Sequence, residues 1–144
     1  MIALLLALAV AERPVPPPSV DGLPIAGLPT QSLPAEGCAA YLFSAGKTRT
    51  LVAMAAATAG TLRLSLDGAT VDYARTSQTG SIGFGFGTAT EYRAADVTVT
   101  LDLAIRTRRD LTQGAAIETG TLRIDRSGKD TIVLPVGGLI GCAA

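Results

Sequence analysis

The sequence predicts an all-β fold, a single antiparallel β-barrel or β-sandwich of about eight strands that is closed by a terminal disulfide. Three observations support this prediction. From residue 41 onward, apolar and polar residues alternate with a period of two, which is typical of strands with one buried face. Turn residues recur at the short spacing of sandwiches and barrels. Two cysteines, Cys38 and Cys142, bracket the alternating region.

Three segments carry the clearest strand patterns. Residues 97–106 place valine, leucine and isoleucine on one face and threonine, aspartate and arginine on the other. Residues 62–66 alternate in the same way and end at Asp67-Gly68, a strong hairpin signal. Residues 82–87 read Ile-Gly-Phe-Gly-Phe-Gly, which predicts a strand with three large apolar side chains on one side and bare glycine on the other.

The remaining predicted strands are shorter or weaker. The segment 51–59 is rich in alanine and also suits a short helix, but its alternation favours a strand. Because each strand has one polar face, a parallel α/β sheet is disfavoured. Further strands are predicted at 41–43, 50–56, 71–73, 88–93, 117–124 and 131–136.

The two cysteines lie in matching tetrapeptides, Gly-Cys-Ala-Ala, at residues 37–40 and 141–144. An even count in a domain that we expect to be exported predicts one disulfide, Cys38–Cys142. Two separate buried thiols are the alternative. A redox-active role is disfavoured because the chain has no Cys-x-x-Cys spacing. If the bond forms, the first and last strands of the domain are neighbours or stacked.

The N-terminal region predicts export. Residues 2–11 form an apolar run too short for a membrane helix, and it ends in a small-x-small cleavage site before Glu12. We therefore expect a signal peptide at 1–11, a Pro-rich linker at 12–36 and a β-rich domain at 37–144. The run lacks a positive n-region, which a start site upstream of Met1 would explain; a buried N-terminal helix is the alternative. Proline favours extended backbone, so the linker is expected to be a spacer outside the core.

Composition excludes several classes of function. The chain has 12 basic and 12 acidic residues, so it lacks the long-range attraction that nucleic acid or an anionic membrane needs. It contains no histidine, which removes histidine-dependent catalysis and histidine metal ligands. We predict no cofactor, no metal, no nucleic-acid partner and no stable membrane span, while the oligomeric state stays open.

The sequence offers no catalytic residue set, but two groups are candidates for surface contact. The first is a glycine run that another chain or a ligand can approach closely. The second is the main basic cluster, which suits a phosphate or carboxylate group or a solvated strand end. The candidates are Gly83, Gly85 and Gly87 in the first group and Arg106, Arg108 and Arg109 in the second. The acids are scattered, and their spacing indicates no catalytic pair.

Three stretches resemble a group of uncharacterised small exported bacterial proteins. They are Cys-Ala-Ala-Tyr at 38–41, Gly-Thr-Leu-Arg-Ile-Asp at 120–125 and Leu-Pro-Val-Gly-Gly-Leu-Ile-Gly-Cys at 134–142. The resemblance covers about residues 37–142. It implies an exported single domain and supplies neither an activity nor site residues.

Three hypotheses of function follow. The first is a binding or structural module of the bacterial envelope, which a rigid scaffold without catalytic residue types favours. The second is a periplasmic inhibitor of lysozyme-like enzymes, which the size and the expected compartment suit, although the chain has no inhibitory loop motif. The third is a hydrolase that uses paired carboxylates in place of histidine.

Overall fold

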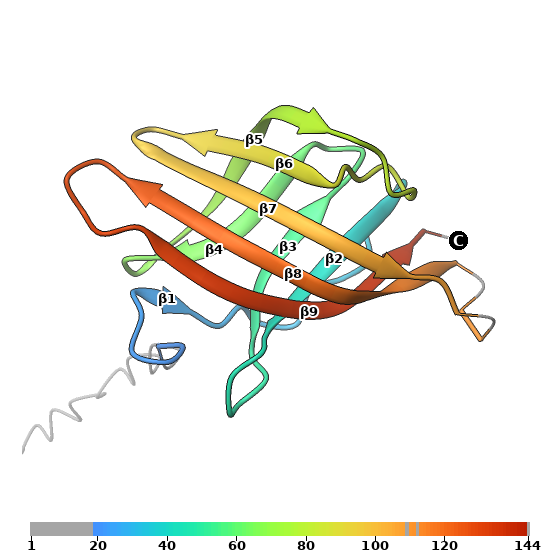
Figure 1. Cartoon of the computed structure of the whole chain (residues 1–144), viewed down its shortest axis with the longest axis horizontal. Coiled ribbons are helices and arrows are strands. Elements are labelled where there is room, and N and C mark those ends of the chain that lie inside the picture. The colour runs from blue at the N-terminus through green and yellow to red at the C-terminus, as the bar shows by residue number, and fades with distance from the viewer. Residues whose placement is uncertain (1–18, 109, 112, 144) are drawn as a thin grey trace, which may run out of the picture.

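The chain forms a closed antiparallel β-barrel of eight strands with one extra short strand, and thus confirms the predicted fold class (Figure 1). The structure is a computed structural model that describes residues 19–108, 110–111 and 113–143. The predicted signal peptide, residues 1–11, lies outside these ranges. The strands are β1 (Ile25–Ala26), β2 (Cys38–Ser44), β3 (Leu51–Ala56), β4 (Thr61–Leu66), β5 (Ala69–Thr79), β6 (Ala89–Ala94), β7 (Val97–Arg106), β8 (Gly114–Arg126) and β9 (Ile132–Cys142).

The barrel is an up-and-down meander. Each strand from β2 to β9 pairs antiparallel with the next, and β9 pairs with β2 to close the ring. The predicted turn at Asp67-Gly68 joins β4 to β5. Both residues have positive φ, 51° and 82°, as a two-residue hairpin turn requires. The alanine-rich segment forms β3, so the strand prediction was correct there and the helical alternative was wrong.

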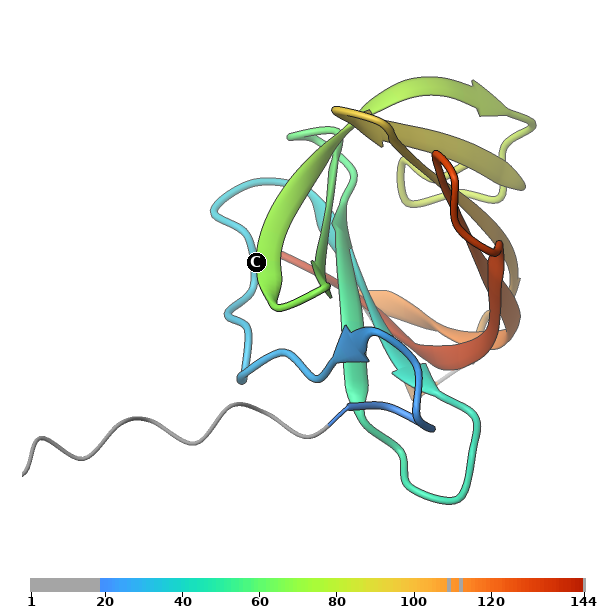
Figure 2. The ribbon, with the colours of Figure 1, turned by 90° about the vertical axis from the view of Figure 1, so that its left-hand side faces the viewer.

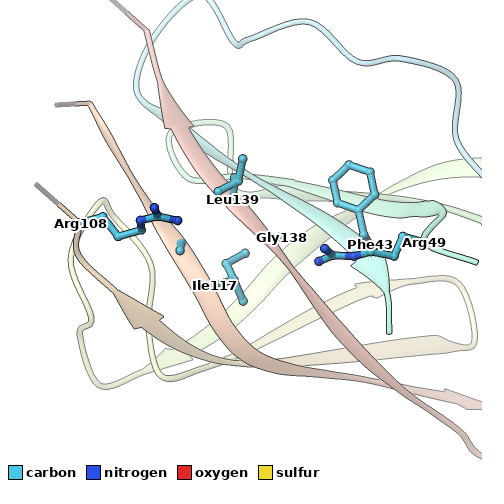
Figure 3. A pocket seen from close by; sticks show the side chains of 7 residues that line it. Phe43, Arg49, Arg108, Ile117, Gly138 and Leu139 are labelled. Atoms are coloured by element: carbon cyan, nitrogen blue, oxygen red, sulfur yellow. The ribbon is translucent and has the colours of Figure 1, made fainter. Parts of the chain in front are cut away.

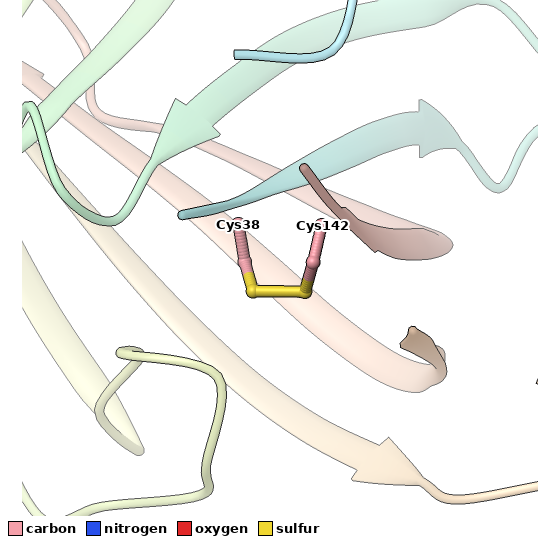
Figure 4. The surroundings of a disulfide bond; sticks show 2 residues. All are labelled: Cys38 and Cys142. Atoms are coloured by element: carbon pink, nitrogen blue, oxygen red, sulfur yellow. A yellow bond between two sulfur atoms is a disulfide. The ribbon is translucent and has the colours of Figure 1, made fainter. Parts of the chain in front are cut away.

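The predicted disulfide joins the first and last strands of the ring (Figure 4). Cys38 and Cys142 are direct partners in the β2–β9 ladder, with their Cα atoms 3.9 Å apart. Seven register pairs follow from this point along the two strands, from Cys38 opposite Cys142 to Ser44 opposite Val136. The bond therefore fastens one end of the seam that closes the barrel. A disulfide is consistent with an oxidising location.

The strands curve around an interior, as the ribbon in Figure 2 shows, and buried side chains fill it. The inward positions of the alternating strands are leucine, isoleucine, valine, alanine and tyrosine, and they form one buried cluster. Eight strands leave an interior just wide enough for such side chains. The largest fully buried members include Leu42, Leu62, Leu64, Tyr92, Leu101, Leu122 and Ile124. Because the interior is filled, the outer wall is the surface available for a functional site.

Tyr92 gives the barrel a sensitivity to alkaline pH. Its side chain is buried on β6, and this burial raises the pKa of the hydroxyl to about 12. The unfolded chain ionises near pH 10, so the stabilisation is complete below pH 10 and is lost as pH rises toward 12. We expect unfolding free energy to fall by roughly 1–3 kcal/mol over this range. Urea titrations at several pH values should show a smaller fall in Tyr92→Phe; an equal fall would contradict the assignment.

The proline-rich segment does not lie apart from the core. Val20, Ile25 and Leu28 are buried, and β1 pairs with the end of β4 through Ile25 opposite Leu66. Beyond β1, the Tyr41 hydroxyl donates a hydrogen bond to the Ser32 carbonyl at 3.1 Å. Val20 and Ile25 of this segment thus belong to the buried core cluster. For residues 19–36 the expectation of a spacer outside the core was therefore wrong, while residues 12–18 of the predicted linker lie outside the described residues.

The strand predicted over residues 82–87 is wrong. This segment is a tight turn in the β5–β6 connection, in which the Ile82 amide donates to the Phe86 carbonyl at 3.0 Å. Three consecutive residues, Gly83, Phe84 and Gly85, have positive φ, which a strand does not allow. The alternating glycines therefore allow the positive φ angles that this turn requires. The turn buries Phe86 against the core cluster.

Candidate functional site

A groove runs along the outer face of β9 (Figure 3). It is an open depression of about 520 Å³, within the range of sites for small ligands. Two adjoining depressions extend it, one of about 480 Å³ that shares Arg108 and one of about 370 Å³ that shares Leu139. We call the first depression the β9 groove. Its lining consists of Phe43, Arg49, Arg108, Ala116, Ile117, Gly138 and Leu139.

Glycine shapes the floor of the groove. Gly138 has φ +152°, and a Cβ at this position would overlap the carbonyl oxygen of Tyr41 on β2. At the neighbouring Gly137, a Cβ would lie 3.8 Å from Nη2 of Arg49. The two residues therefore leave bare backbone on β9, and the arginine side chain extends over it.

Irregular strand pairing bends the wall at the same level. The β8–β9 ladder shifts register between Ile117 and Gly120, and the β7–β8 ladder shifts between Ala104 and Ile105. On the other side of β9, the β2–β3 ladder shifts between Leu42 and Phe43. Bulges re-aim side chains and are frequent at barrel rims and functional sites. Three register shifts near Gly137 and Gly138 therefore make this part of the barrel wall depart from a regular sheet.

Apolar side chains make up most of the groove. Leu139 is a large hydrophobic residue that is 50% exposed, and it stands between Arg49 and Arg108 in Figure 3. Phe43 is half-buried, and Ile117 is buried at the floor. The adjoining depression on the Leu139 side continues this lining with Tyr41. Burial raises the pKa of the Tyr41 hydroxyl above its ordinary value, which keeps this side chain neutral.

The predicted arginine cluster lies at one end of the groove. Arg108 lines it and is paired with Asp110 at 3.1 Å, whereas Arg106 lines the adjoining depression and is paired with Glu118 at 3.1 Å. Arg109 lies outside the described residues. No local pattern predicts that Arg49, from the loop between β2 and β3, joins them. Its position follows from the pairing of β2 with β9, which links segments about a hundred residues apart.

The predicted glycine contacts lie elsewhere. Gly83 and Gly85 belong to the turn in the β5–β6 connection, and Gly87 follows it. A Cβ at Gly85 would lie 2.9 Å from the Cβ of Ala57, in the β3–β4 turn, and a Cβ at Gly87 would lie 2.5 Å from Cγ of Gln78. Close approach is therefore a property of both positions, as expected, but the chain itself supplies the approaching groups.

Carboxylates are spread over the barrel surface. Five depressions on the described part of the surface have at most one carboxylate each in their lining, namely Asp67, Asp102, Asp110 or Glu118, and the β9 groove has none. Most of these acids are held by arginine, as in Arg126–Asp67 at 2.9 Å across the barrel end. None of these five depressions holds a pair of carboxylates.

The fold perturbs the titration of Asp125. Its carboxylate accepts a hydrogen bond from the Thr131 hydroxyl at 2.8 Å and pairs with Arg123 at 3.1 Å, and these contacts lower its pKa. The contact stabilises the fold above the ordinary pKa near 3.8, and this contribution is lost as pH falls through the lower folded value.

We expect Thr131→Val to raise the pKa of Asp125 toward its ordinary value, because the largest contact that favours the ionised form is removed. Carboxyl-carbon NMR titration measures this shift directly. Arg123→Gln should also raise it, because the arginine adds a hydrogen bond and a charge that favour the ionised form. An unchanged pKa of Asp125 in Thr131→Val would contradict the assignment.

The described residues hold no cluster of three or more acidic, cysteine or histidine side chains that would bind a metal ion. Between residues 19 and 143, apart from the two undescribed positions, no helix has the length and apolar character needed to cross a membrane.

The fold and the site together define a class: a small, disulfide-closed antiparallel β-barrel with a packed interior and a groove on its outer wall. No family model matches the chain, and neither a curated protein nor a solved structure does.

Proposed function

We propose that this protein is an exported binding module of the bacterial envelope that contacts its partner through the β9 groove. The observation that carries the proposal is a half-exposed Leu139 in a shaped groove between two arginines. Because side chains fill the interior of the barrel, its outer wall is the surface available for a ligand. Exposed apolar surface that is rimmed by charge is typical of interaction sites.

Export is supported by three features. The Cys38–Cys142 bond suits an oxidising compartment, and residues 1–11 have the pattern of a signal peptide. The resemblance of residues 37–142 to small exported proteins points the same way. Intact-mass analysis of the protein from an expressing bacterium, with and without reductant and alkylation, tests the proposal. We expect cleavage after Ala11 and no free thiol; an uncleaved, reduced chain would contradict export.

The distribution of acids favours binding over hydrolysis. A hydrolase of the paired-carboxylate type needs two carboxyl groups across one cleft, about 5–9.5 Å apart. The depressions described above have single carboxylates, and the β9 groove has none. Its chemistry is apolar and cationic, which suits recognition of a partner with apolar and anionic groups.

A matched pair of variants on β9 tests the binding function. Leu139→Glu places a charge in the groove, whereas Val133→Glu places the same charge at an equally exposed apolar site outside it; the two residues are 50% and 60% exposed. We immobilise the disulfide-bonded protein and its variants and pass lipid, peptidoglycan and protein fractions of an envelope over them.

The expected result is a component that wild type and Val133→Glu retain and that Leu139→Glu loses by about tenfold or more. Equal retention by the two variants would place the contact outside the groove, and no retention by wild type would reject an envelope partner. A purified lysozyme in the same assay tests the inhibitor hypothesis: groove-dependent binding would favour it, and no binding at micromolar concentration would reject it.

A further inference from the structure

Among the described residues that line the β9 groove, one guanidinium has no acidic partner. Arg106 and Arg108 each pair with a carboxylate at 3.1 Å. In contrast, no acid among the described residues lies within 4.0 Å of the Arg49 guanidinium. This side chain extends over the bare backbone of Gly137, and Figure 3 shows it pointing into the groove. The end of the groove at Arg49 is therefore suited to a single anionic group.

The rest of the groove is apolar and elongated. From Arg49, the lining passes Phe43 and Leu139 and continues in the adjoining depression with Leu111 and Ile140. At that far end lies Asp110, whose carboxylate is already paired with Arg108. The lining therefore runs from an unpaired cation through an apolar strip to an ion pair, which favours one orientation of an amphipathic ligand with its anionic group at Arg49.

The groove does not suit the two common polymeric ligands. An extended peptide adds to a sheet through a free edge, but β2, β9 and β8 each pair with strands on both sides. A sugar chain requires many hydrogen-bonding side chains, whereas the polar side chains that line the β9 groove are two arginines. The remaining class of ligand is one that makes a single ionic contact and otherwise apolar contacts.

We propose that the β9 groove binds a free single-chain amphiphile with one anionic head group, a long-chain carboxylate, with its head at Arg49 and its tail along Leu139. This inference rests on the proposed function, since it names the ligand class of the same groove. Each methylene that enters the groove should increase affinity, by about fourfold where it is fully buried. The β9 groove is open to solvent, so we expect the affinity for the ligand to be moderate.

Calorimetric or NMR titration with octanoate, decanoate and dodecanoate, each below its micelle concentration, tests the proposal. Affinity is expected to rise with chain length, and acetate and decyltrimethylammonium are expected not to bind. Arg49→Gln should weaken decanoate binding by about tenfold, because the ionic contact is lost. The matched control Arg93→Gln removes an exposed arginine on β6, outside the groove, and should leave binding unchanged.

Three outcomes would overturn the proposal: equal binding of decanoate and decyltrimethylammonium, equal losses in the two arginine variants, or binding to anionic phospholipid vesicles without binding to soluble decanoate. The last result would assign the surface to a membrane. If decanoate fails while an envelope component still depends on Leu139, the ligand class is wrong and the binding function stands. If Leu139→Glu changes neither measurement, both proposals fail.

Discussion

Replacing Cys38 and Cys142 together by serine is expected to lower the free energy of unfolding by about 4–5 kcal/mol. The two residues are 104 positions apart, so the bond removes most of the loop-closure entropy of the unfolded chain. A small barrel has a total stability of only about 5–15 kcal/mol, and this loss is therefore a large part of it. Guanidinium titration of the oxidised protein and of the double variant measures the difference.

Reduction provides the internal control for this result. Wild type in excess reductant should unfold at the denaturant concentration of the double variant, because both lack the same bond. A difference below about 1 kcal/mol between oxidised and reduced protein would mean that the β2–β9 ladder alone determines the stability of the seam.

Gly138→Ala is expected to destabilise the barrel by about 3 kcal/mol or more. The new Cβ would overlap the Tyr41 carbonyl oxygen, which is part of the backbone of β2 and has no flexible end to move aside. The φ angle of +152° adds strain for any residue with a side chain. The seam must therefore open locally, and thermal and denaturant unfolding should both report the loss.

The adjacent glycine is a matched control for this prediction. At Gly137, a Cβ would have its nearest neighbours at 3.8 Å, which is ordinary contact. Gly137→Ala should change stability by less than about 1 kcal/mol, and in the stabilising direction if the unfolded chain loses entropy. Similar losses in both variants would show that close approach to β2 is not what selects glycine at position 138.

The strands with a strict period of two were predictable because burial of one face determines that pattern. β7 has the same bounds in the structure, Val97–Arg106, as in the sequence prediction. The disulfide was also predictable, since two cysteines in a domain that is expected to be exported leave one pairing. The ends of β5, β8 and β9 extend beyond their predicted bounds, because strand pairing continues there after the apolar alternation has ended.

Two predictions failed for the same physical reason, which is that a local sequence pattern does not by itself determine the backbone conformation. Residues 82–87 have the alternation of a strand, yet their glycines make a turn with positive φ. Proline residues predicted a spacer, yet Ile25 between them is fully buried and pairs with β4. In both segments, long-range packing overrides the local pattern.

The candidate groove was only partly predictable. The arginine cluster was visible as a run of charge, and Arg108 lines the groove. Arg49, Phe43 and Leu139 come from segments that only the closure of the barrel brings together. One local signal was available: the pair Gly137-Gly138 interrupts an otherwise regular strand, and glycine within a strand often marks a bulge or a close approach.

The meander connectivity has a consequence for synthesis. Hairpins from β2 to β8 form one after another as the chain emerges, since each strand pairs with its predecessor. β2, however, acquires its second neighbour only when β9 arrives, about a hundred residues later. Until β9 pairs with both neighbours, the incomplete sheet has two free edge strands, and these can pair with other chains. The final eleven-residue strand, Ile132–Cys142, thus covers both free edges of the sheet, and its deletion is expected to leave an open sheet whose edges can pair with other chains.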